Sequence, residues 1–312
     1  MDDGVGMDST DSAWDCIVIG GGAAGLSAAL VLGRARRRTL VLDAGGQSNL
    51  AAHGIGGLLG QDGRPAAAFY ADGRAELAKY PAIEVRDARA AEVGGESGDF
   101  RVVLEGGETA RAARLVLATG VDYRFPGVAG AAERFGRSVF HCPFCHGWEV
   151  RDGALAVFDP GPMGTARALL LTAWSDDVTL LTDGDAALTP EQRAQLGAAG
   201  VAIDERPVKS LEGPGDELTT LRFASGESRP CTGLLVPVTF DQRGGLADAL
   251  GAARSQEGPF AGQILQVDPM GQTSVPGVWA AGDTATNGPS VAGAIESGAR
   301  AAGAIVHGLT IG

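Results

Sequence analysis

Residues 15–43 read DCIVIGGGAAGLSAALVLGRARRRTLVLD, the pattern of a strand, a glycine-rich turn, a helix and a second strand. The first run is apolar and β-branched, as in a strand buried on both faces. Gly20, Gly22 and Gly25 follow at the G-x-G-x-x-G spacing, which permits a tight turn and close approach of the backbone to a pyrophosphate. Asp43 ends the second strand 23 residues after Gly20 (43 minus 20), where a ribose hydroxyl needs an acceptor. The stretch predicts an α/β dinucleotide site, and the alternative is a glycine-rich turn without a ligand.

The composition restricts the class of protein and its partners. The chain has 312 residues, enough for two domains, and 45% of them are hydrophobic, as in a soluble α/β protein. The formal net charge of −13 disfavours nucleic acid and anionic membranes, because both repel an acidic surface. The basic residues within 34–38 are interpreted as a solvated helix end.

The N-terminal residues favour a cytoplasmic location. Residues 1–15 are acidic and polar, without the basic and apolar regions of a signal peptide. No apolar run approaches the roughly 20 residues that span a bilayer. In a reducing compartment Cys16 and Cys231 are most simply buried thiols, and a C-x-x-C pair is catalytic or metal-binding more often than structural.

A second copy of the strand-turn-helix pattern occupies residues 153–183, and its glycine turn is damaged. Asp159, Gly161 and Gly164 stand where the three glycines should be. A negative charge at the first position would repel a pyrophosphate by about 4 kcal/mol at 4 Å and an effective dielectric of 20. Pro160 and Pro162 also remove two backbone donors.

The end of the second strand in this copy is ambiguous. Asp183 lies 24 residues after Asp159 (183 minus 159) and could accept from the ribose of NADH, and no arginine cluster for a 2′-phosphate follows. The loss of the first glycine leads us to expect that neither nicotinamide cofactor binds usefully.

Two further segments resemble a known family. Residues 115–120 (LVLATG) form a predicted buried strand with a small-residue turn, and residues 278–283 (VWAAGD) form another that precedes a predicted helix at 291–307. Both resemble the marks of the two-dinucleotide flavoproteins of the low-molecular-weight thioredoxin reductase type. The resemblance implies two Rossmann-like dinucleotide-binding domains, with the FAD-binding domain formed by residues 1–122 and 244–312 and an inserted NAD(P)-type domain formed by residues 123–243.

The same resemblance implies which residues surround FAD, in the turns after several predicted strands. They are Gly20, Gly22, Ala23, Ala24, Gly25, Asp43, Ala44, Gln47, Asn49, Ala118, Thr119, Gly120, Gly282, Asp283 and Val291. By resemblance the Ala-Thr-Gly turn abuts FAD, and the carboxylate of Asp283 hydrogen-bonds the ribityl chain. Residues 49–63 resemble a flavin-side loop.

A cysteine pair lies in the inserted domain, in the run Phe140 to Trp148 (FHCPFCHGW). C-x-x-C-H is formally a haem-attachment signature, but such attachment normally implies export. A zinc site requires three or four ligands, and only His141, His146 and this cysteine pair are local, so zinc is disfavoured. A redox dithiol is favoured, because a C-x-x-C at a helix start lowers one thiolate pKa and keeps the other thiol ready to resolve a mixed disulfide.

The resemblance assigns roles to this pair. Cys142 would be the outer cysteine that exchanges with substrate, and Cys145 the inner one that faces the flavin. His146 stands where thioredoxin reductases usually have Asp, and it could act as a general acid or base or be a helix residue without a chemical role. The run CPFCHGWE is similar to dithiol oxidases that form disulfides in small microbial metabolites such as holomycin and gliotoxin.

We therefore expect an FAD-dependent dithiol oxidase that forms an intramolecular disulfide in a small-molecule dithiol and passes the electrons to O2, with H2O2 as product. No metal, nucleic acid or membrane partner is expected, and the resemblance implies a homodimer. One alternative is a disulfide reductase of a thioredoxin-like protein, supplied with electrons by a nicotinamide or a protein donor. The other is a non-catalytic flavin redox sensor.

Overall fold

The computed structural model describes residues 13–184 and 188–311 and divides them into two compact units. Unit 1 holds the described parts of residues 1–48, 67–122 and 240–312, and unit 2 holds those of 49–66 and 123–239. The main difference from the expected domains is the segment 49–66, which the sequence assigned to the FAD-binding domain and the structure groups with unit 2. The second boundary also moves, from 243 to 239.

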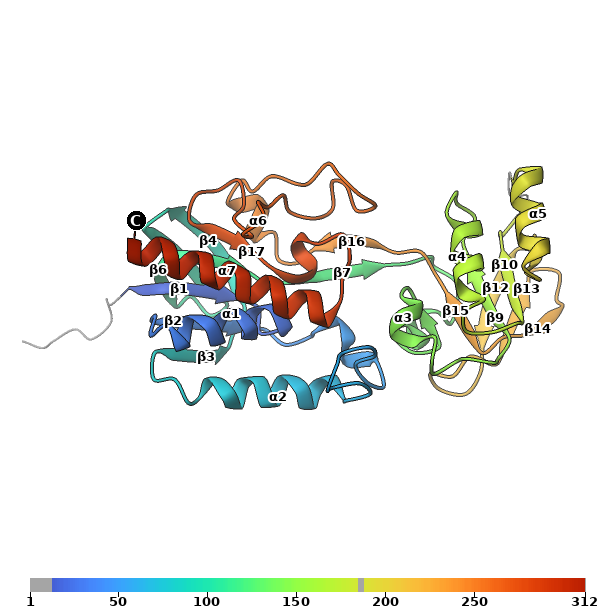
Figure 1. The fold of residues 1–312 in the computed structure, drawn as a ribbon, viewed down its shortest axis with the longest axis horizontal. Helices are drawn as coiled ribbons and strands as arrows, with labels where there is room; N and C mark the ends of the chain where they lie inside the picture. The colour runs from blue at the N-terminus through green and yellow to red at the C-terminus, as the bar shows by residue number, and fades with distance from the viewer. Residues whose placement is uncertain (1–12, 185–187, 312) are drawn as a thin grey trace, which may run out of the picture. The chain divides into compact units, whose positions relative to one another are not determined.

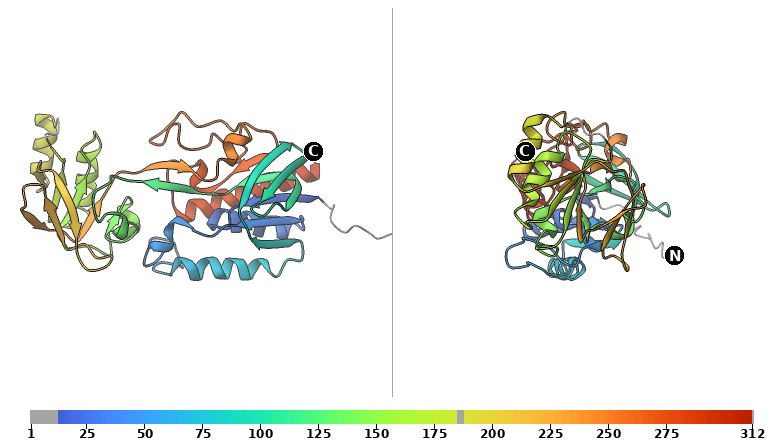
Figure 2. Two further views of the ribbon diagram at one scale, coloured as in Figure 1. Left: turned by 180° about the vertical axis from the view of Figure 1, so that it is seen from behind. Right: turned by 90° about the vertical axis from the view of Figure 1, so that its right-hand side faces the viewer.

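Among the described residues, unit 1 is built on a seven-stranded sheet of order β3-β2-β1-β6-β5-β4, with β17 also paired to β6. Strands β1, β2, β3, β6 and β17 are joined by parallel pairings, whereas β4, β5 and β6 pair antiparallel, and Figure 2 shows the β4–β5 hairpin from behind. The bounds are β1 (Trp14–Ile19), β2 (Thr39–Asp43), β3 (Ile83–Asp87), β4 (Ala90–Glu96), β5 (Asp99–Leu104), β6 (Thr109–Leu117) and β17 (Val278–Ala280).

The helices of this part of the chain include both of those predicted beside the sheet. They are α1 (Ala23–Arg34), α2 (Ala66–Leu77), α6 (Leu246–Ala249) and α7 (Val291–Ile311), with the short 3-10 turn η3 (Gly282–Ala285). The 3-10 turn η1 (Ser48–Ala51) lies at the boundary and belongs to unit 2 from Asn49 onward. Helices α1 and α7 lie side by side (Figure 1), because Gly298 leaves no Cβ where one would come within 2.0 Å of the Ala24 carbonyl oxygen. The predicted helices 23–33 and 291–307 are confirmed, and α7 extends four residues further.

In its described residues, unit 2 contains a five-stranded sheet of order β11-β10-β9-β15-β8 and a three-stranded sheet β12-β13-β14. Strands β9 and β10 pair in parallel with α4 between them, so the second strand-turn-helix copy is confirmed. The strands are β8 (Val139–Phe140), β9 (Leu155–Phe158), β10 (Val178–Leu181), β11 (Ala202–Asp204), β12 (Val208–Glu212), β13 (Thr220–Phe223), β14 (Ser228–Pro230) and β15 (Gly233–Leu235). The helices are α3 (Pro143–His146), α4 (Gly164–Leu171) and α5 (Pro190–Ala198), with the 3-10 turn η2 (Ala132–Arg134).

Two strands carry the chain between the units: β7 (Val121–Arg124) and β16 (Thr239–Gln242) pair as a two-stranded ribbon. Each unit has its own apolar core, with Leu40 and Leu115 fully buried in unit 1 and Phe223 and Leu234 fully buried in unit 2. Within the described ranges, the helices are all too short or too polar to cross a membrane.

Candidate active site

Cys142 and Cys145 form a disulfide at the start of the short helix α3, with their Cα atoms 5.4 Å apart. Pro143 occupies the first helical position, where its missing N–H costs nothing. Cys142 is the N-cap residue, and the Cys145 N–H donates to its carbonyl at 3.2 Å. The structure therefore holds the predicted redox pair in its oxidised form, in the turn that the C-x-x-C spacing favours.

His146 ends α3, and its ring lies between the cysteine turn and the preceding loop. Nε2 lies 2.9 Å from the Gly136 carbonyl oxygen, and Nδ1 is buried without a hydrogen-bond partner among the described residues. Burial is the largest cause that lowers the pKa of His146, and the backbone of Gly136 and Cys142 opposes the shift. The imidazole is therefore held as a neutral ring near pH 7.

Two further histidines lie close to His146 in unit 2. Burial, and then the neighbouring His146, lower the pKa of His141 to about 4, and its ring packs 4.6 Å from that of Tyr123. His53 acts on the pKa of His146 as a nearby like charge. His53 and His141 thus both lie near His146, which ends the helix that carries the cysteine pair. In the sequence His141 and His146 stand beside the cysteine pair, whereas His53 was not predicted to lie there.

The loop of residues 49–66 packs against the cysteine helix. A Cβ on Gly56 would lie 2.6 Å from the Cys145 carbonyl oxygen, so only glycine fits there without movement. Nε of Arg137 donates to the Ala51 carbonyl at 2.7 Å and anchors the start of the loop. The loop that resembled a flavin-side segment is therefore part of the wall around the disulfide in unit 2.

Exposed apolar side chains surround the same turn. Phe144, between the two cysteines, is 70% exposed, and Trp148 and Leu59 are 66% and 99% exposed. Large apolar side chains in such positions commonly mark a surface that contacts a ligand or partner.

In unit 1 the first glycine turn has the close approaches that a dinucleotide site needs. Gly20 has φ +118°, and a Cβ there would lie 2.1 Å from the Ala118 carbonyl oxygen. A Cβ on Gly25 would lie 1.8 Å from the Gly20 carbonyl oxygen, so α1 begins tightly against the turn. Its N-cap, Gly22, has no side chain, and its first turn carries no acid. The helix N-terminus is therefore available to an anion.

The other predicted FAD residues of unit 1 come to the same sheet edge. Asp43 is only 5% exposed, and its carboxylate packs where a Gly21 side chain would stand. Gln47 Nε2 reaches the Asp43 carboxylate at 3.2 Å, and Arg74 forms an ion pair with it at 3.0 Å. A Cβ on Gly282 would lie 3.0 Å from that of Ala24.

The remaining predicted FAD residues follow strand ends or begin a helix. Ala44 follows β2, Thr119 and Gly120 follow β6, Asp283 lies in the turn after β17, and Val291 begins α7. Parallel strands place these carboxyl ends together, so the residues fit a dinucleotide such as FAD. Asn49 is the exception, because it belongs to unit 2.

The second glycine turn corrects one sequence argument. Asp159 follows β9 as predicted, but its charge is not a bare one, because Arg167 of α4 forms an ion pair with its carboxylate. The Gly161 N–H also donates to Asp159 Oδ1 at 2.8 Å. The sequence missed Arg167, whose only signal was its position eight residues after the acid. The repulsion estimated for an isolated Asp159 is therefore wrong, although the turn remains altered.

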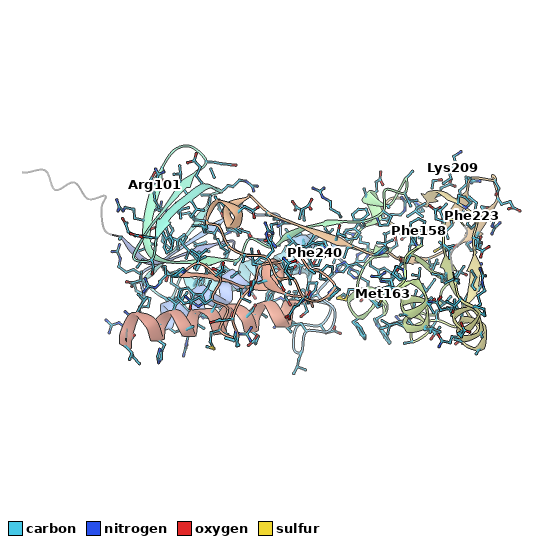
Figure 3. The ribbon with its side chains drawn as sticks, turned by 90° about the horizontal axis from the view of Figure 1, so that it is seen from above. Arg101, Phe158, Met163, Lys209, Phe223 and Phe240 are labelled. Atoms are coloured by element: carbon cyan, nitrogen blue, oxygen red, sulfur yellow. A yellow bond between two sulfur atoms is a disulfide. The ribbon has the colours of Figure 1, made fainter. Side chains whose placement is uncertain are left out.

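A cavity of about 670 Å³ lies in unit 2 at this turn. Phe158, at the end of β9, and Lys209 both line it, and both are labelled in Figure 3. Asp159 and Asp183 line it as well. Asp183 Oδ1 accepts from the Val208 N–H at 2.7 Å, so one of its oxygens already has a partner.

Cys16 and Cys231 lie away from this chemistry. Both are buried free thiols, and burial raises the pKa of Cys231 to about 12 and that of Cys16 further. Cys16 lies in β1, as expected, whereas Cys231 lies between β14 and β15. Neither thiol is available as a thiolate near neutral pH.

Comparison with known proteins agrees with this geometry. The model of the pyridine nucleotide-disulphide oxidoreductase family matches residues 14–298. The thioredoxin reductase tcpT of Claviceps purpurea (strain 20.1) is 34% identical over 301 residues, which cover 93% of this chain and 92% of that protein.

Solved structures give the same result. An oxidoreductase from Agrobacterium tumefaciens has a TM-score of 0.90 at 37% identity, covering 96% of this chain and 99% of its own. The crystal structure of HlmI has a TM-score of 0.87 at 38% identity, covering 95% of this chain and 92% of its own. The chain therefore belongs to the pyridine nucleotide-disulphide oxidoreductase family, and it is an FAD-binding oxidoreductase with the thioredoxin reductase-like two-domain fold.

Proposed function

We propose that the protein oxidises a small-molecule dithiol to its intramolecular disulfide and passes the electrons to O2. The observation that carries this proposal is the Cys142–Cys145 disulfide with a neutral His146 beside it. The run CPFCHGWE, which resembles that of dithiol oxidases, supports a small-molecule substrate. The resemblance to thioredoxin reductases further suggests that the enzyme acts as a homodimer.

The thiol chemistry proceeds in two exchanges. A substrate thiolate attacks Cys142 Sγ, which breaks the Cys142–Cys145 bond, forms a mixed disulfide and releases the Cys145 thiolate. The second substrate thiol then loses its proton and attacks the substrate sulfur of the mixed disulfide. The substrate leaves as a disulfide, and the two electrons remain on the reduced cysteine pair.

His146 is the proposed proton carrier for these steps. Because Nε2 donates to the Gly136 carbonyl, the lone pair of the neutral ring is on Nδ1. Nδ1 has no other partner among the residues described, so it can accept a thiol proton when the ring and the thiol come within reach. A lowered pKa keeps this base form populated at neutral pH.

FAD bound at the glycine turn and strand ends of unit 1 would supply the two-electron redox chemistry that returns the cysteine pair to the disulfide and passes the electrons to O2, with H2O2 as product. The protein's own contribution to that half of the cycle is binding. Gly20 and Gly25 allow the backbone to come close to the pyrophosphate, and the Asp43 carboxylate can accept a hydrogen bond from a ribose hydroxyl.

A disulfide reductase is the second candidate, favoured by the family description and by the names of relatives such as the Claviceps protein. In that reading electrons flow from a nicotinamide or a protein donor through FAD to the cysteine pair. A flavin redox sensor would bind FAD and exchange its dithiol state without multiple turnovers.

An anaerobic titration of the FAD-loaded protein separates these functions. The flavin absorbance is followed while NADPH, NADH and then a small dithiol such as dithiothreitol are added. The proposal expects bleaching by the dithiol alone, followed when air enters by recovery of colour and by one H2O2 for each dithiol oxidised. Rapid bleaching by either nicotinamide would make the reductase the better reading, and absence of repeated turnover in air would favour the sensor.

A further inference from the structure

The two glycine turns of this chain share a backbone framework. Gly20 follows β1, and Asp159 follows β9 at the corresponding place. The third glycine keeps its packing role in both, because a Cβ on Gly164 would lie 2.6 Å from the Asp159 carbonyl oxygen, as one on Gly25 would approach that of Gly20. Unit 2 has therefore kept the shape of a phosphate-binding turn.

The groups that would bind a diphosphate at this turn are already engaged. In such a turn the N–H of the middle glycine points at the phosphate, and a nearby cation strengthens the contact. Here Gly161 is the middle glycine, and its N–H donates to Asp159 at 2.8 Å. Arg167, in the first turn of α4, pairs with the other oxygen of the same carboxylate. Asp159 is only 5% exposed, so its carboxylate lies inside the turn.

The helix start is changed as well. Helix α1 begins three residues after Gly20, whereas α4 begins five residues after Asp159. Pro160 and Pro162 lie between Asp159 and the first residue of α4 and have no N–H to offer. Met163, labelled in Figure 3, is the N-cap of α4 and gives no side-chain cap.

We infer that the Asp159 carboxylate is an internal substitute for a nucleotide diphosphate: it takes the Gly161 N–H and the Arg167 guanidinium that the ligand would need. A diphosphate is excluded because Asp159 already occupies these donors. Charge repulsion is not the main cause, since the carboxylate is paired with Arg167. The cavity of about 670 Å³ beside it leaves room for a ligand, so removing the carboxylate should open a binding site for a dinucleotide diphosphate. The residues of this turn therefore do not fit the pyridine nucleotide that the family name implies.

The inference is tested by binding and does not depend on turnover. Isothermal titration calorimetry of FAD-loaded protein is done with ADP-ribose and NADH. Wild type should bind both ligands only weakly, with a Kd in the millimolar range. Asp159→Gly should bind about tenfold to a hundredfold more tightly than wild type, the gain expected from one or two charge-assisted hydrogen bonds. Asp159→Gly/Arg167→Gln should lose most of that gain.

Asp183→Asn is the matched control. It removes one negative charge from the same cavity, keeps a side-chain oxygen that can accept from a ribose hydroxyl, and frees neither the Gly161 N–H nor Arg167, so it should bind like wild type. An equal gain in Asp183→Asn would mean that general repulsion, and not occupation, closes the turn. Micromolar binding by wild type, or no gain in a folded Asp159→Gly protein with normal FAD content and melting temperature, would overturn the inference. Micromolar binding by wild type without reduction of the flavin would overturn the inference alone, whereas a nicotinamide that reduces wild type would count against both the inference and the proposed oxidase.

Discussion

Nε2 of His146 lies 2.9 Å from the carbonyl oxygen of Gly136, ten residues earlier in the chain. A carbonyl can only accept, so this contact places the proton on Nε2 and leaves Nδ1 as the base. Gly136 has φ +87°, which favours glycine, and a Cβ there would lie 3.2 Å from that of Ala51. The orientation of the ring thus depends on a backbone turn that only a glycine adopts readily.

Replacing His146 with Gln should slow the oxidation of the dithiol by about a hundredfold, the usual scale of general acid–base catalysis. Stopped-flow absorbance of the flavin measures the rate. His307→Gln, an exposed change on α7, is the matched control and should keep the wild-type rate. An unchanged rate in His146→Gln would remove His146 from the mechanism.

The pH profile of the same rate should show the base form of His146. Because burial lowers its pKa below the ordinary value near 6.5, the wild-type rate should show an additional acid limb below that pH, beyond the gradual loss of substrate thiolate. The histidine accepts protons only when neutral, so activity is present above its pKa and lost below it. The acid limb should vanish in His146→Gln, and a limb that persists unchanged would have to come from another group.

His141 should make the protein less stable in mild acid. Its folded pKa of about 4 lies below the unfolded value near 6.5, so the unfolded chain binds a proton that the folded chain does not. Stability is therefore lost as pH falls from about 6.5 to 4, by about 2 kcal/mol between pH 7 and pH 5. Urea unfolding at both pH values measures this. His141→Phe keeps a ring against Tyr123 and should show a smaller difference between the two pH values.

Serine variants of the two cysteines should both lose turnover while they stay yellow with bound FAD. They should differ in what they trap. When a linear disulfide such as oxidised glutathione is added, the Cys142 thiolate of Cys145→Ser attacks it, releases one thiol and holds the other half as a mixed disulfide, whereas Cys142→Ser leaves only the inner thiol. Mass spectrometry under non-reducing conditions detects the adduct. A stable adduct in Cys142→Ser alone would reverse the assigned roles.

Gly56→Ala should destabilise unit 2 by about 1–3 kcal/mol, the usual cost of overpacking, because the new Cβ meets the Cys145 carbonyl at 2.6 Å. A thermal melt followed by circular dichroism measures the loss. Gly197→Ala in α5 is the control, since no atom lies within 4 Å of its Cβ position and alanine favours a helix. Equal melting temperatures for the two variants would show that the loop does not pack tightly against the cysteine helix.

Local patterns were enough to predict much of the fold and the central chemistry. The glycine spacing after β1 and the acid that ends β2 depend on neighbours within one βαβ unit, so they can be read from a single stretch. The C-x-x-C pair is likewise local, because four residues place its Cα atoms 5.4 Å apart. The second βαβ copy was also visible, because its buried strands and its third glycine keep the same pattern.

Only the tertiary structure decided which side chains contact these elements. Contacts between residues far apart in the sequence depend on how the whole chain folds, and a short sequence pattern does not encode them. The bond from His146 to Gly136 and the packing of Gly56 on Cys145 belong to this class. Asp159 is the clearest case: the sequence determined that an acid stands in the second turn, but only the folded structure decided that Arg167 neutralises it. The same residue that read as a bare repulsive charge is held inside the turn by an ion pair and a backbone N–H.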